Sequence, residues 1–285
     1  MRGACLCGDV TWEGSGPGEL VHYCHCGMCR KTHGTAFATA GGVPADGFRF
    51  LSGEAGIRRY ASSPGNQRGF CGRCGASVPG AAFDGTVFVP FGNVVDDPGG
   101  RPVAHIFVAS KAPWYEIPDD GLPRFDAYPP GYADTELFPE PARGAAGGAN
   151  AGRIGGSCLC GAVAFDFTPP VDAWHNCHCS RCRRGRGTAH ASNLFLDARR
   201  FRWLRGEDQT VAFKVPEAER FTQTFCRTCG SKAPRINLQA GYVAIPGGSL
   251  DDDPGKRPER HIYVASQAPW FAIADELPQF PEFLT

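Results

Sequence analysis

Hydrophobic and polar residues alternate in short runs along this 285-residue chain, and turn-forming residues separate the runs. Val10 and Trp12 flank a polar position, and Val163, Phe165 and Phe167 repeat the alternation much later in the chain. An alternation with a period of two is typical of a β-strand with one buried face. The abundance of glycine (38) and proline (24) favours turns between such strands over long helices.

The predicted strands come in matching pairs, one from each half of the chain. Only the stretches after about Arg30 and Arg183 have room for a helical turn. We therefore expect an all-β fold that occurs twice. Besides the runs named above, the predicted strands cover residues 48–50 and 201–203, 57–60 and 211–215, 86–89 and 242–245, and 105–108 and 261–264.

The cysteines repeat with the same spacing in both halves. All fourteen cysteines of the chain fall into two sets of seven. Five members of the set are displaced by 153 residues (Cys5 to Cys158) and the last two by 155 (Cys71 to Cys226). Cysteines that served only in packing would not keep this register. The repeat therefore indicates a duplicated metal-binding domain.

A second long match, near the end of each copy, supports two domains of ordinary size. His105-Ile-Phe-Val-Ala-Ser-Lys-Ala-Pro-Trp114 corresponds to His261-Ile-Tyr-Val-Ala-Ser-Gln-Ala-Pro-Trp270 at a displacement of 156 residues. Small and turn-forming residues dominate 139–152, a composition typical of a flexible linker. We expect domains at 1–138 and 153–285 with this linker between them. The sequence leaves open whether the domains pack together as an internal pseudo-dimer.

Charge and chain composition restrict the partners and the compartment. The formal net charge is zero, with 29 basic and 29 acidic residues, which provides no electrostatic surface for nucleic acid or an anionic membrane. No segment has the roughly 20 apolar residues that span a bilayer. The first residues show no apolar stretch of signal-peptide length, so we expect a cytoplasmic protein. Thiols stay reduced there, and clustered cysteines then favour metal binding over a disulfide framework.

Each set of seven cysteines divides into two outer pairs and one local triplet. Structural zinc takes four ligands in a tetrahedron, whereas catalytic zinc takes three from the protein and keeps one position open. The outer pairs therefore predict a closed site and the triplet an open one, with two zinc ions per domain and four per chain. An iron–sulfur cluster is the alternative, but it takes four thiolates and fits the division poorly. The predicted catalytic triplets are Cys24, Cys26 and Cys29, and Cys177, Cys179 and Cys182; the predicted four-cysteine sites are Cys5, Cys7, Cys71 and Cys74, and Cys158, Cys160, Cys226 and Cys229.

These motifs resemble those of the glutathione-dependent formaldehyde-activating enzyme (Gfa) family, which also includes the centromere protein V type. The resemblance rests on Gly3-Ala-Cys-Leu-Cys-Gly8, on Cys24-His-Cys-Gly-Met-Cys-Arg-Lys31, on the zinc-knuckle pairs and on the segment that ends at Trp114, together with their counterparts. It covers nearly all of both copies except the linker. The resemblance implies two tandem β-tent domains, each with a structural four-cysteine zinc and a three-cysteine zinc at the active site.

The reaction class that the resemblance implies is the formation or cleavage of a carbon–sulfur bond. In that family, glutathione adds to formaldehyde to give S-hydroxymethylglutathione. We therefore expect a zinc-dependent carbon–sulfur lyase that acts on adducts of glutathione, or a similar thiol, with formaldehyde or another small aldehyde. Two alternatives stay open, namely a non-catalytic carrier of glutathione or another thiol and a zinc-stapled interaction module.

Basic residues follow each triplet directly. Three thiolates on Zn²⁺ leave a net charge near −1, and an incoming thiolate takes the site toward −2, which is costly without nearby cations. We expect these basic residues to offset the charge or to hold a glutathione carboxylate, with ordinary solvated charges as the alternative. The tryptophans that follow Ala-Pro could cover the ligand or anchor the core. The candidate substrate contacts are Arg30, Lys31, Arg183, Arg184, Trp114 and Trp270.

Histidines lie inside and near the triplets, and the two copies differ there. We expect the rings of His25 and His178 to bond to backbone near the metal, with a proton relay or a fourth ligand as the alternative. Phe37 of the first copy becomes His190 in the second. Such changes surround the expected pocket, so we expect the two sites to differ in substrate or in activity.

Overall fold

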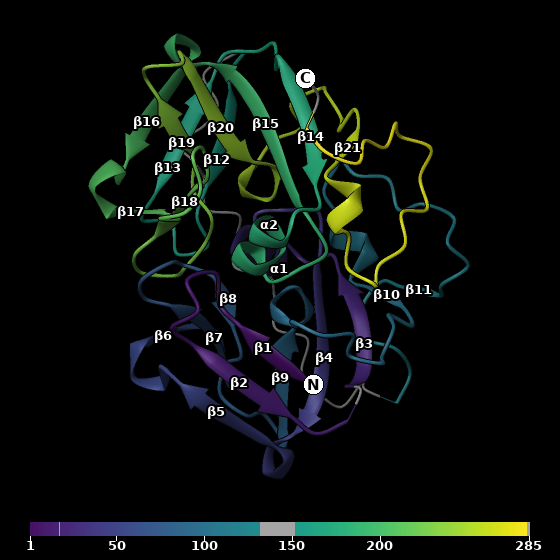
Figure 1. The fold of residues 1–285 in the computed structure, drawn as a ribbon. Coiled ribbons are helices and arrows are strands. Elements are labelled where there is room, and N and C mark those ends of the chain that lie inside the picture. Colours follow the sequence, from purple (N-terminus) through teal and green to yellow (C-terminus); the bar gives the residue numbers. More distant parts are fainter. Residues whose placement is uncertain (17, 132–151, 284–285) are drawn as a thin grey trace.

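The computed structural model describes residues 1–16, 18–131 and 152–283. The expected linker, apart from Gly152, and the boundary at residue 138 lie outside the described residues, so the domain limits stay a prediction. The described residues form two copies of one arrangement. Figure 1 shows the first copy (purple to blue) below the second (green to yellow).

The first copy combines three sheets with the short helix α1 (Gly27–His33). The sheets have the strand orders β1-β2-β5, β6-β7-β8 and β11-β10-β3-β4-β9. In the last of these, β10 runs parallel to both β3 and β11, whereas the other neighbours are antiparallel. The strands are β1 (Arg2–Ala4), β2 (Thr11–Gly14), β3 (Glu19–Cys24), β4 (Ala38–Pro44), β5 (Phe48–Ser52), β6 (Ile57–Ser63), β7 (Asn66–Cys71), β8 (Ser77–Val78), β9 (Thr86–Pro90), β10 (His105–Ile106) and β11 (Arg124–Phe125).

The second copy repeats this plan around the helix α2 (Ser180–Arg186). Its sheets have the strand orders β12-β13-β16, β17-β18 and β19-β20-β15-β14-β21. Strand β21 pairs in parallel with β14, which leads into the triplet, just as β10 pairs with β3 in the first copy. The strands are β12 (Ile154–Ser157), β13 (Ala164–Phe167), β14 (Ala173–Cys177), β15 (Ala191–Asp197), β16 (Phe201–Arg205), β17 (Thr210–Lys214), β18 (Thr222–Cys226), β19 (Arg235–Asn237), β20 (Tyr242–Pro246) and β21 (His261–Ile262).

Two of the predicted strands are shorter than expected. The strand predicted at 105–108 ends at Ile106, and the one predicted at 261–264 ends at Ile262. Phe107 and Tyr263 both adopt a φ of 57°, which is the left-handed region and is rare for large aromatic residues. The chain therefore leaves the sheet and enters the 3₁₀-helices η4 (Val108–Ser110) and η8 (Val264–Ser266). A hydrophobic pattern does not report such a backbone conformation.

The two α-helices begin inside the cysteine triplets, three residues before the helical turns that the sequence predicts. Cys26 is the N-cap of α1, and its sulfur accepts a hydrogen bond from the backbone N–H of Cys29 at 3.4 Å. Cys179 caps α2 in the same way. Helix α1 ends at Gly34, whose φ of 65° suits a left-handed C-cap. Each triplet is thus fixed where a strand passes into a helix.

One hydrophobic core runs through both copies. The ring centroids of Trp114, from the first copy, and Trp174, from the second, lie 4.8 Å apart. The rings of Phe91 and Trp270 meet across the copies at 5.5 Å. All four side chains are buried, so neither copy could be removed without exposing core residues of the other.

Each triplet helix packs on a 3₁₀-helix of the other copy. The two helices lie at the centre of Figure 1, where His33 of α1 bonds to the carbonyl of Arg186 in α2 at 2.6 Å. Helix α1 lies against η7 (Gly247–Ser249), and α2 lies against η3 (Phe91–Asn93). A Cβ atom on Gly248 would lie 2.2 Å from the carbonyl oxygen of Arg30, and one on Gly92 would lie 2.2 Å from the backbone nitrogen of Thr188. Only glycine permits these approaches.

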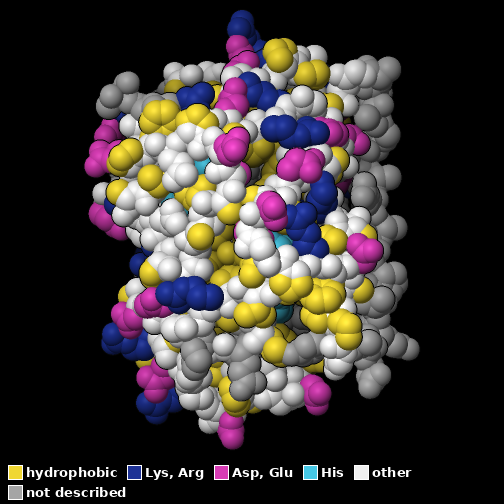
Figure 2. Space-filling model, turned by 90° about the vertical axis from the view of Figure 1, so that its right-hand side faces the viewer, with side chains coloured by type: hydrophobic (Ala, Val, Ile, Leu, Met, Phe, Trp, Pro, Cys, Tyr) yellow, Lys and Arg dark blue, Asp and Glu magenta, His cyan; other side chains and the backbone are white. Residues whose placement is uncertain are grey.

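The surface carries both signs of charge. Figure 2 shows Lys and Arg side chains interspersed with Asp and Glu on the face that it presents, with hydrophobic side chains between them. No helix in the described ranges is long and apolar enough to cross a membrane.

Candidate metal centres and active site

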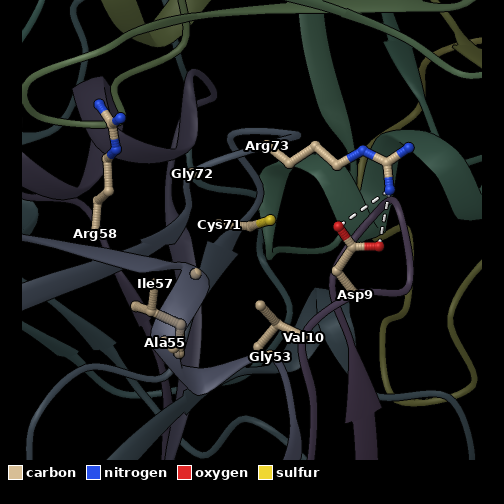
Figure 3. A pocket seen from close by; sticks show the side chains of 10 residues that line it. Asp9, Val10, Gly53, Ala55, Ile57, Arg58, Cys71, Gly72 and Arg73 are labelled. Atoms are coloured by element: carbon tan, nitrogen blue, oxygen red, sulfur yellow. Dashed lines mark hydrogen bonds and ion pairs between the residues drawn. The ribbon is translucent and has the colours of Figure 1, made fainter.

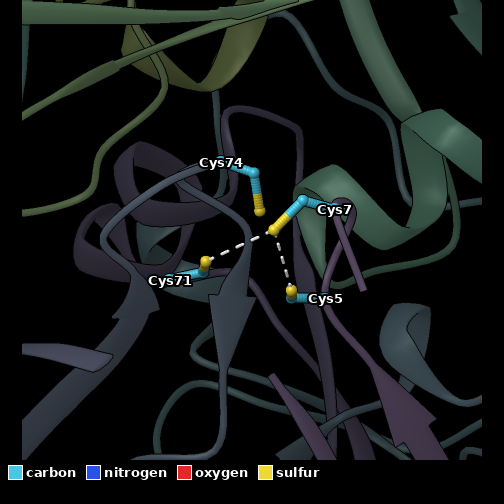
Figure 4. A group of neighbouring side chains, drawn as sticks. All are labelled: Cys5, Cys7, Cys71 and Cys74. Carbon is cyan, nitrogen blue, oxygen red and sulfur yellow. Dashed lines mark hydrogen bonds between the residues drawn. The ribbon is translucent and has the colours of Figure 1, made fainter. Parts of the chain in front are cut away.

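Four cysteine sulfurs converge at one site in each copy. In the first copy, Cys5 and Cys7 follow β1, and Cys71 ends β7 with Cys74 just beyond it (Figure 4). The four sulfurs lie within 4.8 Å of one another. The Sγ of Cys7 is 3.4 Å from that of Cys5 and 3.7 Å from that of Cys71. The two equivalent distances in the second copy are 3.5 and 3.8 Å.

These separations fit a tetrahedral metal site. Metal–sulfur bonds of about 2.3 Å, as zinc makes, place neighbouring sulfurs about 3.8 Å apart. Backbone N–H groups also donate to the sulfurs, from Val10 to Cys5 at 3.3 Å and from Val163 to Cys158 at 3.2 Å. A hydrogen bond to sulfur favours the thiolate over the thiol. The sulfurs therefore converge, in the groups that the spacing predicts, as a donor set for a metal.

The loops that close these sites also join the two copies. Gly75 and Gly230 have φ values of 69° and 71°, and the N–H of Gly75 bonds to the carbonyl of Cys71 at 2.8 Å. A Cβ atom on Gly75 would lie 2.2 Å from the ring of Phe225, and one on Gly230 would lie 2.5 Å from that of Phe70. The two phenylalanine rings meet edge to face at 6.2 Å. Both four-cysteine sites therefore border the contact between the copies.

Three sulfurs converge at each triplet. Cys24 ends β3, Cys26 caps α1 and Cys29 lies in the first turn of that helix. Their sulfurs lie within 4.8 Å of one another, and no fourth Cys, His, Asp or Glu ligand atom from the described residues joins either triplet. Three thiolates without a fourth ligand are the donor set of an open metal site.

Each triplet contains one thiol with a strongly lowered pKa. Hydrogen bonds from Cys24 and Cys26 hold the pKa of Cys29 well below its usual range. In the second copy, hydrogen bonds from Cys177 and Cys182 lower the pKa of Cys179 to about 3. Because the thiolate is the form that binds metals, this sulfur is the first donor that each triplet offers to a cation, while the pKa values of the other two thiols are raised.

The histidine inside each triplet bonds to a second histidine. His25 Nε2 lies 2.9 Å from His105 Nδ1, and His105 Nε2 lies 2.9 Å from Asp120 Oδ2. The carboxylate accepts from His105, so a neutral His105 accepts in turn from His25. Burial, and then the nearby His105, lower the pKa of His25 to about 3. The second copy repeats this chain with His178, His261 and Asp275. The expected backbone partner is thus replaced by a histidine, which a pattern of residues along the chain could not show.

Two of the predicted substrate contacts reach the other copy instead. Lys31 pairs with Asp251 at 2.5 Å, and both charged side chains are only 11% exposed. Lys31 also donates to the carbonyl of Ser157 at 2.9 Å. Arg184 donates to the carbonyl of Cys5. A substrate role for these two side chains stays a prediction, and their contacts between the copies disfavour it.

The other four predicted substrate contacts are buried or half-buried side chains. Arg30 is 5% exposed, and Arg183 is half-buried. Burial lowers the pKa of Arg183, and the nearby thiolate of Cys179 partly offsets this effect. Trp114 and Trp270 belong to the shared core, which favours the core role over the covering role. Contact with a substrate stays a prediction for all four.

Sequence reasoning missed two polar groups beside the first triplet. Arg68, in β7, places Nη1 and Nη2 each 3.6 Å from the Sγ of Cys29. Burial, and then the charge of Cys24, raise the pKa of Tyr128 to about 12, so its phenol stays protonated. The displacement of 155 residues pairs Arg68 with Gln223, and that comparison of the copies could have marked the position.

A pocket opens beside the first four-cysteine site (Figure 3). Its wall contains Gly53, Gly56 and Gly72, and the ion pair of Asp9 with Arg73, at 2.9 Å, lies at its edge. The two charges satisfy each other. The lining residues hold no nucleophile apart from a cysteine of the four-cysteine site, so the triplets remain the candidate active sites.

Comparison with known proteins places these sites in a family. The family model described as glutathione-dependent formaldehyde-activating enzyme matches residues 1–110 and 153–266. The chain belongs to this family, in two tandem copies. A Halomonas elongata protein, provisionally named a glutathione-dependent formaldehyde-activating enzyme, is 30% identical over an alignment of 126 residues that covers 41% of this chain and 79% of that protein. The crystal structure of a Rhodobacter sphaeroides protein matches this chain with 25% sequence identity and a TM-score of 0.28. The match covers 36% of this chain and 97% of the Rhodobacter protein.

Membership of the Gfa family confirms the expected family and the expected fold class. Two separate matches, one in each half, agree with the duplicated cysteine sets and with the two mostly β copies. The Halomonas relative matches about the length of one copy. The chain is therefore a fusion of two Gfa-type domains, each with a four-cysteine group and a triplet.

Proposed function

We propose that this Gfa-family protein is a zinc-dependent carbon–sulfur lyase that joins a small thiol to a small aldehyde and cleaves the same adduct. The family points to glutathione as the thiol and formaldehyde as the aldehyde. In the forward direction the thiol loses its S–H proton, the sulfur–carbon bond forms, and the carbonyl oxygen takes up a proton to become a hydroxyl. No oxidant or reductant is required.

The observation that carries this proposal is the pair of three-thiolate sites. The described residues offer three sulfurs and no fourth ligand at each triplet, whereas they offer four at each outer site. The four-cysteine sites would hold structural zinc and the triplets catalytic zinc, four ions per chain in all. A zinc ion at a triplet would supply a Lewis acid that keeps an incoming thiol deprotonated.

The residues around the first triplet suit the other requirements of the reaction. Met28, Ile106 and Phe107 form an apolar cluster with the three cysteines. Leu159 reaches this cluster from the second copy, so the contact between copies limits the access of water. The protonated phenol of Tyr128 can donate a hydrogen bond to the aldehyde oxygen as it becomes a hydroxyl.

The test is the rate of exchange between free and thiol-bound formaldehyde. Zinc-loaded protein, with its metal content measured by elemental analysis, is mixed with glutathione and ¹³C-formaldehyde, and exchange spectroscopy measures the rate of adduct formation and breakdown. We expect a rate above the spontaneous one and about four zinc ions per chain. Cys29→Ser combined with Cys182→Ser should return the rate to the spontaneous value. Because this double variant keeps all eight cysteines of the four-cysteine sites, the ions at those sites should stay bound.

Two other outcomes would change the assignment. Glutathione binding without any rate above the spontaneous one would identify a thiol carrier. If the zinc-loaded protein showed no binding of glutathione and no turnover, the proposed function would be contradicted and an interaction module would be favoured. The double variant distinguishes turnover at the triplets from any general effect of the protein surface.

A further inference from the structure

The surroundings of the two triplets differ on the strand that leads to the second cysteine pair, where an arginine of the first copy is replaced by a glutamine in the second. Arg68 lies three residues before Cys71 in β7, and Gln223 lies three residues before Cys226 in β18. Both occupy equivalent places in their hairpins, since Arg68 pairs with Tyr60 and Gln223 pairs with the corresponding residue of β17. The duplication therefore brings a cation to this place in one copy and a neutral amide in the other.

In the first copy the guanidinium of Arg68 is fixed against the triplet. Both Nη atoms lie 3.6 Å from the Sγ of Cys29, and Nε donates to the hydroxyl of Ser62 at 3.1 Å. The side chain is half-buried. A planar group held at three nitrogens has little freedom to turn away, so its charge stays beside the metal-binding sulfurs.

In the second copy the equivalent side chain serves the contact between the copies. The amide Nε2 of Gln223 donates to the carbonyl of Cys74 at 2.7 Å, and a Cβ atom on Gly185 would lie 2.3 Å from its Oε1. Arg183 and Arg186 donate to the carbonyl of His178 and to the amide oxygen of Asn193. Among the residues that the structure describes, no side-chain nitrogen makes the corresponding contact with Cys182.

We propose that Arg68 makes the first triplet the tight thiolate-binding site of this chain and leaves the second triplet as a weak one. This inference rests on the proposed function and concerns the same sites. With zinc bound, the first triplet and Arg68 together have a net charge near zero, and an incoming thiolate takes them to about −1. Arg183 and Arg186 lie near the second triplet, but both donate to neutral oxygens. Neither guanidinium is in contact with a sulfur there, so the charge of an added thiolate is offset less than in the first triplet.

The two sites should therefore differ in thiol affinity by about tenfold or more, because a charge beside a partly desolvated anion contributes at least that factor to binding. Arg68 acts on the charge of the bound sulfur and not on the body of the thiol. The preference should thus be the same for a thiol that has no carboxylates. Neutral ligands of the metal should show no such preference.

The experiment titrates the cobalt-substituted full chain with 2-mercaptoethanol, and in parallel with glutathione and with imidazole, following the cobalt charge-transfer bands. For the wild type we expect one tight thiol equivalent and a second that binds about tenfold or more weakly. Arg68→Gln, which copies the residue of the second domain, should convert the tight equivalent into a weak one. Arg68→Lys should restore most of the tight binding, and imidazole affinity should not change in any variant.

The matched control is Arg59→Gln, which removes the same charge from the neighbouring strand β6, where Arg59 pairs with the exposed Glu54. This variant should titrate like the wild type. Cobalt content and thermal unfolding of each variant show that the sites are intact. If Arg68→Gln lowered the cobalt content, Arg68→Lys would still distinguish a charge effect, since it keeps the cation without the planar contact.

The outcomes separate this inference from the proposed function. Two equal thiol equivalents that Arg68→Gln leaves unchanged would overturn the inference, while the proposed function would stand. An effect of Arg68→Gln on glutathione but not on 2-mercaptoethanol would also overturn it, because Arg68 would then hold a carboxylate. Absence of any thiol binding in the wild type would overturn both.

Discussion

His190 occupies the place that Phe37 has in the first copy, and the two rings meet edge to face across the copies at 5.4 Å. His190 is 3% exposed. Burial, and then the charge of the nearby His261, lower the pKa of His190 to about 3. The folded protein therefore keeps this ring neutral at pH values where a solvated histidine takes up a proton.

Replacing His190 with Phe should flatten the loss of stability at acid pH. The folded pKa of about 3 lies below the unfolded value of about 6.5, so only the unfolded chain binds this proton between those values. Above about pH 6.5 His190 does not change the free energy of unfolding. Below that pH its protonation in the unfolded chain lowers the free energy of unfolding by about 1.4 kcal/mol per pH unit. Urea unfolding of wild type and H190F between pH 7 and 5, at a fixed zinc concentration, measures the difference. The free energy of unfolding of H190F should depend less steeply on pH, by an amount that corresponds to one bound proton.

A packing control separates titration from ring shape at this contact. Phe37→Leu changes the same pair of rings without changing a titrating group, so its free energy of unfolding should fall by a constant amount at every pH. Protonation of the metal-binding thiolates contributes equally to all three proteins. Parallel profiles for wild type and H190F would show that His190 takes up its proton equally in the folded and the unfolded chain, so that folding does not lower its pKa.

At the residue scale, the sequence predicts the cysteine groups but not the residues around them. The spacing of the cysteines repeats, and metal geometry restricts how seven thiols can divide, so the groups follow from the sequence alone. Arg68 reaches Cys29 only because the β6–β7 hairpin folds over the start of α1. Lys31 looks like a substrate contact in the sequence, but it is buried against Asp251 of the other copy. Contacts of this kind depend on tertiary packing, which local patterns do not encode.

The contact of each triplet helix with a 3₁₀-helix of the other copy depends on one glycine. We expect Gly248→Ala to destabilise the protein by about 1–3 kcal/mol, because the added methyl group would press on the backbone of α1 and the helix would have to move. Its Cβ would lie 2.2 Å from the carbonyl oxygen of Arg30 and 2.4 Å from the backbone nitrogen of Thr35. Urea unfolding measures the loss, and Gly92→Ala should act in the same direction on α2.

Gly56 provides the matched control for these substitutions. A Cβ atom there would meet nothing within 4 Å, and the residue has no left-handed φ. Gly56→Ala should therefore leave the free energy of unfolding nearly unchanged or raise it slightly. If Gly248→Ala behaved like Gly56→Ala, the helix contact would have to be looser than the structure shows.

At the element scale, the alternation of hydrophobic residues predicts most strands but not where they end. Strands such as β5 and β9 form where the pattern indicates them. The strands before η4 and η8 end early because Phe107 and Tyr263 adopt the left-handed backbone conformation. A large aromatic residue in this conformation has a steric cost that the surrounding packing must offset, and only the folded structure reveals that packing.

At the scale of the whole molecule, one buried ammonium group joins the two four-cysteine sites. Lys232 is 1% exposed, and its Nζ donates to the carbonyls of Gly75 at 2.8 Å and Gly230 at 3.1 Å. These glycines follow the last cysteine of each site. Burial, and then the nearby Arg186, lower the pKa of Lys232 to about 7, against the thiolates of the two sites. Lys232 therefore ties the loop of one four-cysteine site to the loop of the other.

Removing the metal-binding thiols of one four-cysteine site should loosen the folded structure of both copies. Structural zinc contributes an apparent ~10–16 kcal/mol to the folding of small peptides, which is comparable to the whole stability of a domain, about 5–15 kcal/mol. We expect Cys158→Ser combined with Cys160→Ser to increase hydrogen exchange in peptides of the first copy as well as the second. Mass spectrometry reads the two copies separately. Protection that persisted in the first copy would show that it folds independently of its partner.

The two copies should stay associated when the chain between them is cut. A protease site introduced within residues 139–152 allows cleavage, and the halves should then elute together at the size of the intact protein, because they share a core and the buried Lys31–Asp251 pair. Lys31→Met removes the cation beside the buried Asp251, which keeps the hydroxyl of Ser157 as a donor, and should weaken the association by about 3 kcal/mol or more. Arg101→Met, which breaks the exposed pair with Asp97, should have no measurable effect. Halves that separated as folded monomers would show that the shared core is not needed for either domain to fold.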